Sequence, residues 1–265
     1  MRRWAALPAV VTVAAGCVSP RATLHAEPPR VPPAVDAQTL ARRLAAMDPL
    51  WPGHAHEPVD CATRECVALT FDDGPGKHTG RLLDLLREHG VRATFFVLGE
   101  KAAEDRHGTL RRMVDDGHEL GNHTWTHRQL TTLSSAGIRN ELRRTQRLVE
   151  HLTGVRMRMM RPPFGATGRR VAAESRREGL AQVLWDVDTV DWRDRVPSVV
   201  ARRAGRARAG SVVLLHDIHR STVEAMPELL SRLSHKGYAF VTVSELYGTP
   251  LAPGREYPDR QDARR

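Results

Sequence analysis

The amino-acid sequence predicts a single-domain α/β fold in the form of a distorted (β/α)7 barrel. Short apolar and β-branched runs alternate along the chain with longer segments of helical periodicity, and this alternation is typical of a parallel sheet. A glycine follows each expected helix, where a left-handed end favours a residue without a Cβ atom. The length of 265 residues accommodates one α/β barrel of about 200 residues.

The elements of the expected barrel follow one another in a regular order. Strands are expected at residues 67–71, 93–97, 118–121, 157–161, 182–185, 211–215 and 239–243. Helices are expected between them, at residues 80–89, 101–116, 134–152, 169–178, 197–209 and 222–236. The glycines after the helices are Gly90, Gly117, Gly154, Gly179, Gly210 and Gly237. This length and spacing favour a barrel over an open sheet.

Residues 1–16 have the features of an export signal. Arg2 and Arg3 form a short basic start, and the apolar run over residues 4–16 is shorter than the roughly 20 residues that a membrane span requires. The run ends directly before Cys17, in a pattern that resembles a bacterial lipoprotein processing site. We therefore expect lipidation of Cys17 as the chain's contact with the membrane, with ordinary secretion after cleavage nearby as the alternative.

Three further regions follow the signal. Residues 17–60 are rich in proline, alanine and histidine, which is typical of a linker, and apolar residues at helical spacing predict one short helix within residues 36–47. Residues 61–248 form the expected domain. The polar and charged segment 249–265 is expected to be a disordered tail.

The chain has three cysteines, and two of them stand directly before the first expected strand. If Cys17 is lipidated, Cys61 and Cys66 remain as an even pair. An exported protein folds in an oxidising compartment, so we expect these two to form a disulfide, with two free thiols as the alternative. The sequence has no second cysteine or histidine pair at the spacing of a structural zinc site.

The formal net charge of +9 comes from 40 Lys and Arg against 31 Asp and Glu. Such an excess could serve nucleic-acid binding. However, the arginines are scattered through helical segments, and no helix-turn-helix, zinc-finger or RNA-binding motif accompanies them. We expect no nucleic-acid partner and interpret the arginines as a solvated surface, with attraction to an anionic wall or membrane as the alternative.

Polar motifs follow five of the expected strands, at the carboxyl ends that form the functional face of parallel α/β folds. In chain order they are Thr70-Phe71-Asp72-Asp73-Gly74-Pro75, His123-Thr124-Trp125-Thr126-His127, Arg161-Pro162-Pro163-Phe164-Gly165, Asp188-Thr189-Val190-Asp191-Trp192 and Leu214-Leu215-His216. Each alone could be a turn, a helix cap or a chance pair of histidines. Their joint position on one rim indicates an active site.

In these motifs the chain resembles the polysaccharide deacetylase family, also called carbohydrate esterase family 4. All five family motifs occur in order within residues 66–247, and no motif residue is replaced by one that would abolish the chemistry. The resemblance implies a distorted (β/α) barrel that forms a single catalytic domain. It also implies a divalent metal and a polysaccharide substrate that loses acetyl groups.

By this resemblance, Asp73, His123 and His127 are the metal ligands. One carboxylate and two imidazoles leave a coordination position open, which is the pattern of a catalytic site. Zinc suits these ligands best, and cobalt, nickel or manganese would also fit. Asp72 is the expected general base, because adjacent side chains diverge and it cannot easily share the metal with Asp73. Arg161 should hold Asp72 by a charge-assisted hydrogen bond.

The remaining roles follow from the same resemblance. His216 is the expected general acid, and Asp191 should orient it and keep it protonated. The backbone N–H of Phe164 should stabilise the oxyanion. Trp192 and Leu214 are expected to lie against the acetyl methyl group.

Several alternatives stay open at this point. His219 could act as the acid in place of His216, although its position past the strand end favours a loop role, and Trp125 could stack on a sugar or merely pack. The expected reaction is hydrolysis of N-acetyl groups from N-acetylglucosamine units of peptidoglycan or chitin-type polysaccharide. Removal of O-acetyl groups from acetylated xylan, or carbohydrate binding without catalysis, are the alternatives.

Overall fold

The structure is a computed structural model that describes residues 59–258. The predicted signal peptide at 1–16, the lipidation candidate Cys17 and the predicted helix within 36–47 lie outside the described residues. All of residues 59–258 fall within one compact unit. None of the helices in this part of the chain has the length and apolar character that crossing a membrane would require.

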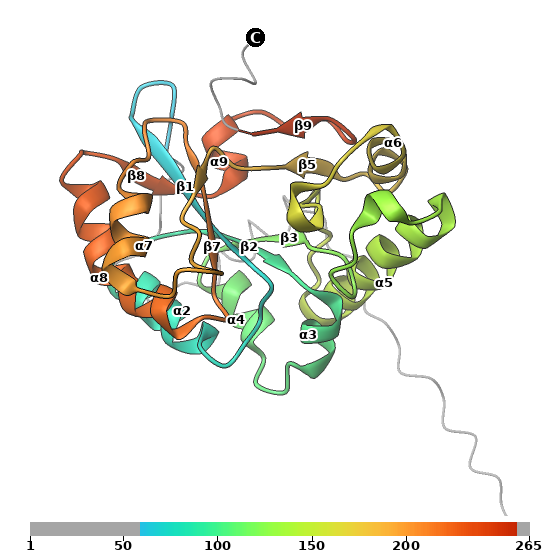
Figure 1. Cartoon of the computed structure of the whole chain (residues 1–265), viewed down its shortest axis with the longest axis horizontal. Coiled ribbons are helices and arrows are strands. Elements are labelled where there is room, and N and C mark those ends of the chain that lie inside the picture. Colours follow the sequence, from blue (N-terminus) through green and yellow to red (C-terminus); the bar gives the residue numbers. More distant parts are fainter. Residues whose placement is uncertain (1–58, 259–265) are drawn as a thin grey trace, which may run out of the picture. The chain divides into compact units, whose positions relative to one another are not determined.

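A parallel sheet forms the centre of the domain, with β1 (Cys66–Asp72) in its middle (Figure 1). Its strands lie in the order β6-β7-β1-β2-β3-β4-β5-β9, and β8 pairs with the first part of β1. The other strands are β2 (Thr94–Val97), β3 (Glu119–Asn122), β4 (Met159–Met160), β5 (Ala181–Val183), β6 (Val187–Asp188), β7 (Val212–His216), β8 (Ala239–Val241) and β9 (Glu256–Tyr257). Because the strands are parallel, their carboxyl ends meet on one side of the sheet.

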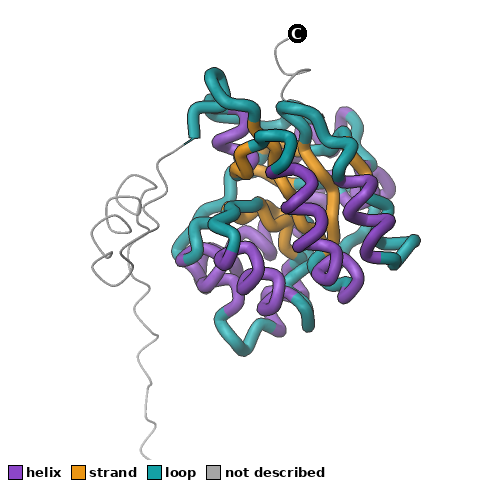
Figure 2. The backbone as a smooth tube through the Cα atoms, turned by 90° about the vertical axis from the view of Figure 1, so that its left-hand side faces the viewer, coloured by secondary structure: helices purple, strands orange, loops and turns teal. Residues whose placement is uncertain are grey.

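Helices cover the outer side of this sheet (Figure 2). They are α2 (Thr79–Glu88), α3 (Gly99–Glu104), α4 (Thr109–Asp115), α5 (Ser135–Thr153), α6 (Arg169–Arg177), α7 (Pro197–Ala204) and α8 (Arg220–Ser234). The short helix α9 (Val243–Tyr247) packs instead with the apolar cluster of the inner face, and the chain also has the 3-10 turns η1 (Leu130–Thr132) and η2 (Pro163–Gly165). The predicted α/β barrel is confirmed, and each of the seven predicted strands corresponds to a strand of the sheet.

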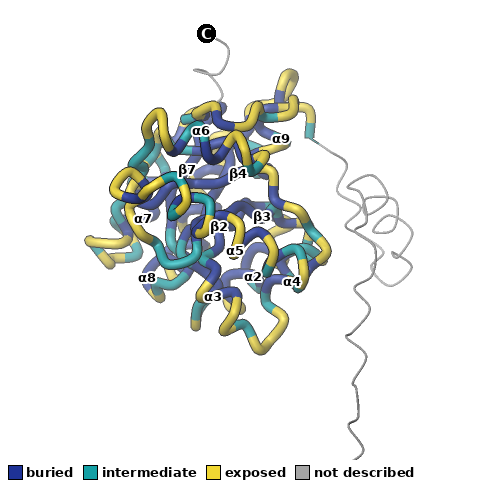
Figure 3. Tube along the Cα trace, turned by 90° about the vertical axis from the view of Figure 1, so that its right-hand side faces the viewer, coloured by how far each residue is buried: buried dark blue, intermediate teal, exposed yellow. Residues whose placement is uncertain are grey.

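Successive side chains of β1 point to opposite faces of the sheet, as the period of a strand requires. Leu69 and Phe71 face the helices and belong to the main apolar core. Ala68 faces the inside of the barrel and belongs to a second apolar cluster. Thr70 and Asp72 continue this inner face, where they bond to the same guanidinium. Figure 3 shows the strands buried beneath more exposed helices and loops.

Three local features differ from the prediction. The helix predicted at 101–116 is two helices, because Gly108 adopts a left-handed φ of 69° and the carboxylate of Asp105 accepts a hydrogen bond from the N–H of Leu110. The strands β6 and β9 and the helix α9 were not predicted. β6 and β9 each contain only one apolar residue, so no apolar run marks them, whereas the equally short β4 lies within the apolar run predicted at 157–161.

The prediction of a disordered tail from residue 249 onward is wrong for residues 249–258. Within this segment β9 pairs with β5, with Val183 opposite Tyr257. The ring of Tyr257 packs against Tyr247 with centroids 5.2 Å apart, and its hydroxyl accepts a hydrogen bond from the N–H of Ala252. One buried tyrosine therefore anchors a segment whose composition is otherwise polar.

Cys61 and Cys66 form a disulfide in the structure. Both residues are buried and belong to the apolar cluster inside the barrel. Cys66 is also the first residue of β1. The bridge therefore ties the segment before the sheet to its central strand.

Candidate active site

Two adjacent carboxylates, those of Asp72 and Asp73, lie in different surroundings at the carboxyl end of β1. Asp72 is the last residue of the strand and is only 3% exposed. Asp73 follows it with a left-handed φ of 73°. Asp72 turns towards Arg161, whereas Asp73 turns towards His123 and His127.

Both histidines lie on the loop that follows β3. The segment is not helical, but it is tightly looped, so that both imidazoles face Asp73. Oδ1 of Asp73 lies 3.4 Å from Nε2 of His123 and 3.5 Å from Nε2 of His127. The ligand atoms of the three residues lie within 4.8 Å of one another, and the group could hold a metal ion.

The chemistry of this group fits a divalent cation. Oδ1 of Asp73 is buried and has no hydrogen-bond partner among residues 59–258. Nδ1 of His123 lies 2.8 Å from the carbonyl oxygen of Arg161. Because a carbonyl oxygen only accepts, Nδ1 carries a proton, and the lone pair of the neutral ring is on Nε2, facing Asp73.

The ionisation of the group also suits metal binding, which requires a carboxylate and neutral imidazoles. Burial raises the pKa of Asp73, but the neighbouring imidazoles of His123, His127 and His216 outweigh burial and lower it to about 2. Burial lowers the pKa of His127 below its ordinary 6.5, and the nearby ring of His123 lowers it further. Asp73 is therefore ionised and His127 is neutral at neutral pH.

Arg161, the residue after β4, is fully buried inside the barrel. Its Nη1 donates to Oδ1 of Asp72 at 2.7 Å and to the hydroxyl of Thr70 at 2.8 Å. Its Nε and Nη2 donate to the carbonyl oxygens of Val183 and Leu184 at 3.1 and 2.9 Å. These contacts fix the guanidinium, and the guanidinium in turn fixes the carboxylate of Asp72.

His216 ends β7 and is the register partner of Asp72 on β1. Its Nδ1 lies 2.8 Å from Oδ1 of Asp191. Oδ2 of Asp191 accepts from the backbone N–H of His216 at 2.8 Å and from the hydroxyl of Thr222 at 2.6 Å. Burial lowers the pKa of His216, but its hydrogen bond and ion pair with Asp191 outweigh burial and raise the pKa from 6.5 to about 9. Burial raises the pKa of Asp191, and the contacts with His216 reverse this and lower it.

The three residues predicted to contact substrate differ in exposure. Phe164 and Trp192 are 68% and 48% exposed, unusually high for large apolar side chains, whereas Leu214 is buried on β7. The ring of Phe164 stands edge-on to His127 with centroids 4.7 Å apart. Phe164 therefore lies directly beside the candidate metal group, and Trp192 is an exposed ring in the residue after Asp191.

The half-buried ring of Trp125 contacts two other elements of the protein. The guanidinium carbon of Arg144 lies 3.9 Å from the ring centroid. A Cβ atom added at Gly99 would lie 2.3 Å from the ring, so the indole lies directly on the backbone there. These contacts favour a packing role over stacking on a sugar.

Two titratable residues, Asp217 and His219, follow His216, and His219 was the competing candidate for the acid. The ring of His219 lies 5.9 Å from that of His216, and burial together with Arg195 lowers its pKa, which disfavours His219 as a proton donor at neutral pH. Asp217 is fully buried and accepts from the hydroxyl of Thr79. Burial raises the pKa of Asp217 to about 7.

Comparison with known proteins decides the family. The sequence model described as polysaccharide deacetylase matches residues 60–183. A peptidoglycan-N-acetylglucosamine deacetylase of Bacillus cereus is 34% identical over 189 residues, which cover 69% of this chain and 68% of that protein. The chain belongs to the polysaccharide deacetylase family.

Other members of the family are more similar to the chain. The peptidoglycan-N-acetylglucosamine deacetylase PgdA of Listeria monocytogenes is 42% identical over 204 residues, which make up 76% of this chain but 43% of PgdA. The chain thus spans less than half of this curated relative. A solved deacetylase structure with bound substrate is 46% identical, has a TM-score of 0.72, and matches 75% of this chain and 99% of its own.

Four of the five motifs of this family member share an unusual backbone geometry. Among residues 59–258, positive φ angles outside glycine occur at Asp73, Thr124, His127, Phe164 and Val190. Every one of these residues lies within one of the five motifs. Such conformations cost on the order of 1–3 kcal/mol each and persist only where surrounding contacts hold them. The motifs therefore specify backbone geometry as well as chemical groups.

Two supporting residues were missed because no motif or spacing marks them. Thr222 on α8 donates its hydroxyl to Asp191. Asn122 at the end of β3 accepts from the N–H of Thr124 at 2.8 Å and donates to the carbonyl oxygen of Leu142 at 2.9 Å. Both act between elements distant in sequence, and a polar residue at such a position reads as an ordinary surface or cap residue.

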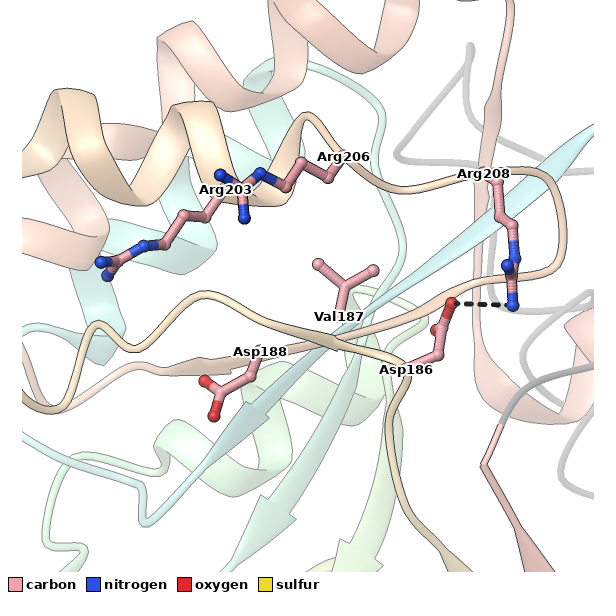
Figure 4. A pocket seen from close by; sticks show the side chains of 6 residues that line it. All are labelled: Asp186, Val187, Asp188, Arg203, Arg206 and Arg208. Atoms are coloured by element: carbon pink, nitrogen blue, oxygen red, sulfur yellow. Dashed lines mark ion pairs between the residues drawn. The ribbon is translucent and has the colours of Figure 1, made fainter.

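A separate pocket of about 240 Å³ lies beside β6 and the end of α7 (Figure 4). Its lining residues are Asp186, Val187, Asp188, Arg203, Arg206 and Arg208. Asp186 accepts from the hydroxyl of Ser211 and the N–H of Val212, both at 2.7 Å. Asp188 accepts from the N–H of Val190 at 2.7 Å. Asp186 thus joins the segment before β6 to the start of β7, while Asp188 holds its own loop, and neither belongs to the candidate metal group.

Replacing Asp191 with asparagine should move the pKa of His216 from about 9 down towards its ordinary 6.5, because the paired carboxylate is lost. The raised pKa stabilises the native protein fully below pH 6.5, and this stabilisation is lost as the pH rises through about 9. NMR titration of the His216 ring in metal-free protein measures the shift. Asp188→Asn is the matched control and should leave His216 unchanged. An equal pKa in wild type and Asp191→Asn would contradict the assigned cause.

Proposed function

We propose that this chain is a hydrolase that removes N-acetyl groups from N-acetylglucosamine units of peptidoglycan or chitin-type polysaccharide and releases acetate. The observation that carries the proposal is the convergence of three groups on one end of the sheet. These are the ligand set around Asp73, the ion pair of Asp72 with Arg161, and the ion pair of His216 with Asp191. Membership of the family supports the same reaction.

Each group supplies one requirement of amide hydrolysis. A divalent cation held by Asp73, His123 and His127 would polarise the acetyl carbonyl group and lower the pKa of water. Asp72 is the general base that accepts a proton from the attacking water. The contact of 2.7 Å with Arg161 holds its carboxylate in place.

The other half of the reaction requires a proton donor and a stabilised oxyanion. His216 is the general acid that protonates the departing amine, and its pKa of about 9 supports a protonated ring at neutral pH. Asp191 orients this ring through Nδ1. The backbone N–H of Phe164 donates to the oxyanion, while Trp192 and Leu214 contact the acetyl methyl group.

The metal we propose is zinc, because two imidazoles and one carboxylate suit it, although cobalt, nickel or manganese would fit the same ligands. The names of the similar deacetylases support a cell-wall substrate. The predicted export signal supports an extracytoplasmic location, with the protein anchored through a lipid on Cys17 or secreted.

O-acetyl esters of xylan are the second candidate substrate, because the same groups would hydrolyse an ester. Carbohydrate binding without catalysis predicts a broken ligand or base position. The presence of Asp72, Asp73 and His216 in contact with their partners argues against it.

Purified protein should release acetate from N-acetylated oligosaccharides, lose this activity on treatment with a chelator and regain it when zinc is added back. Acetate is quantified for peptidoglycan fragments, chitin oligomers and acetylxylan in parallel. Full turnover by protein stripped of bound ions would contradict the metal-dependent mechanism. Release from acetylxylan alone would favour the ester substrate.

Replacing Asp72 and Asp73 one at a time should distinguish the role of general base from that of metal ligand. Asp72→Asn removes the proton acceptor and should lower kcat by about 10²–10⁴-fold while metal content is retained. Asp73→Ala should lose both metal and activity. Metal content is measured by elemental analysis and activity by acetate release. Retained metal in both variants would contradict the role of Asp73.

His216→Ala should lower kcat by about 10²–10⁴-fold, because the departing amine loses its proton donor. His219→Ala, which removes the neighbouring imidazole, should retain most of the activity. The two variants are compared by acetate release under identical conditions. An inactive His219→Ala beside an active His216→Ala would reverse the assignment.

A further inference from the structure

A single carboxylate outside the motifs holds the middle of the loop that carries both candidate metal-binding histidines. The backbone N–H groups of Trp125 and Thr126 donate to Oε2 of Glu141 at 2.9 and 2.8 Å. The hydroxyl of Thr126 donates to Oε1 at 2.9 Å. Glu141 is only 6% exposed, so these are buried, charge-assisted hydrogen bonds, which are about twice as strong as neutral ones.

The remaining N–H groups of loop 123–127 also have acceptors. They are the carbonyl oxygen of Val97 for His123, the side chain of Asn122 for Thr124, and the side chain of Thr124 for His127. Two of these acceptors end the strands β2 and β3, namely Val97 and Asn122, and the third, Thr124, lies in the loop itself. Glu141 is the one acceptor for these groups that comes from a helix.

The position of Glu141 is set by a rigid element. It lies on α5, where its neighbours Ile138 and Leu142 are completely buried in an apolar cluster. The carbonyl oxygen of Leu142 also accepts from Asn122, the residue just before the loop. The helix therefore holds the loop through Glu141 and the residue before the loop through Leu142.

The position of His127 depends on the hydrogen bonds to Glu141 more than the position of His123 does. The ring of His123 is 3% exposed and bonded to the carbonyl oxygen of Arg161. The ring of His127 is 30% exposed, and no hydrogen bond to it occurs among the described residues. Thr124 and His127 both have left-handed φ angles, 73° and 58°, which are strained for residues with a side chain. Without Glu141 the loop can relax, and Nε2 of His127 would then leave Asp73.

We propose that Glu141 is a positioning residue that holds His127 in place for metal binding. The inference rests on the proposed metal site. Glu141 touches neither the ligand atoms nor the substrate groups. Its effect is exerted through the backbone of Trp125 and Thr126, and it should appear first as metal affinity.

The test compares the zinc affinity of Glu141→Ala, Glu141→Gln and wild type by competition with a chelator of known affinity. Supporting contacts around metal ligands typically change affinity by about 10–100-fold, and we expect a loss of this size for Glu141→Ala. Glutamine can direct its oxygen at both N–H groups and donate its amide to the hydroxyl of Thr126. Glu141→Gln should therefore recover most of the affinity.

Glu119 offers a matched control at the opposite end of β3 from His123. Its carboxylate accepts from the N–H of Ser244 at 3.0 Å, from the hydroxyl of Ser244, and from the hydroxyl of Thr94 at 3.2 Å. Glu119→Ala, like Glu141→Ala, should lower the melting temperature of the metal-free protein, but it should leave zinc affinity unchanged. Equal zinc affinity in the two alanine variants would overturn the inference.

A double-mutant cycle tests whether Glu141 acts through His127. His127→Ala should weaken zinc binding by itself, and adding Glu141→Ala should weaken it little further. Independent, additive losses would overturn a role through His127. Wild-type protein that binds no zinc, cobalt, nickel or manganese would instead overturn the proposed metal site, so the two failures are distinguishable.

Discussion

The site depends on one arginine buried where the strands of the barrel end. The side chain of Arg161 holds the carboxylate of Asp72, and its backbone carbonyl oxygen accepts from Nδ1 of His123. One residue thereby fixes both the proposed base and the tautomer of a proposed metal ligand. Removing one partner of a buried ion pair typically costs about 3–5 kcal/mol, so the stability of the inner barrel and its chemistry are coupled.

The alternation of the strands makes such a polar interior compatible with a stable fold. Phe71 points outward into the apolar core beneath the helices, and the next residue, Asp72, points inward to Arg161. His216 lies beside Asp72 because β1 and β7 pair in that register. The proposed acid and base therefore occupy neighbouring strand ends, where regular backbone hydrogen bonds hold them without local strain.

The proposed metal ligands are held in a different way. Asp73 and His127 lie on loops with left-handed backbone, which local preference disfavours. The side chains of Asn122 and Glu141 accept hydrogen bonds from the backbone of the loop that carries His127. Strand ends thus provide the proposed proton-transfer groups, while loops held by other side chains bring the candidate ligands within reach of one another.

The amino-acid sequence by itself predicted the order of seven strands and the helical segments between them, the motif residues and the cysteine pair, because periodicity, turn residues and motif spacing are local properties of the chain. The tertiary structure decided three further features: the raised pKa of His216, the hydrogen bonds of Glu141 to the loop that carries His127, and the strand at Glu256–Tyr257. Each depends on burial, or on contact between residues far apart in the sequence. Such contacts exist only once the chain has folded, so no local sequence pattern predicts them.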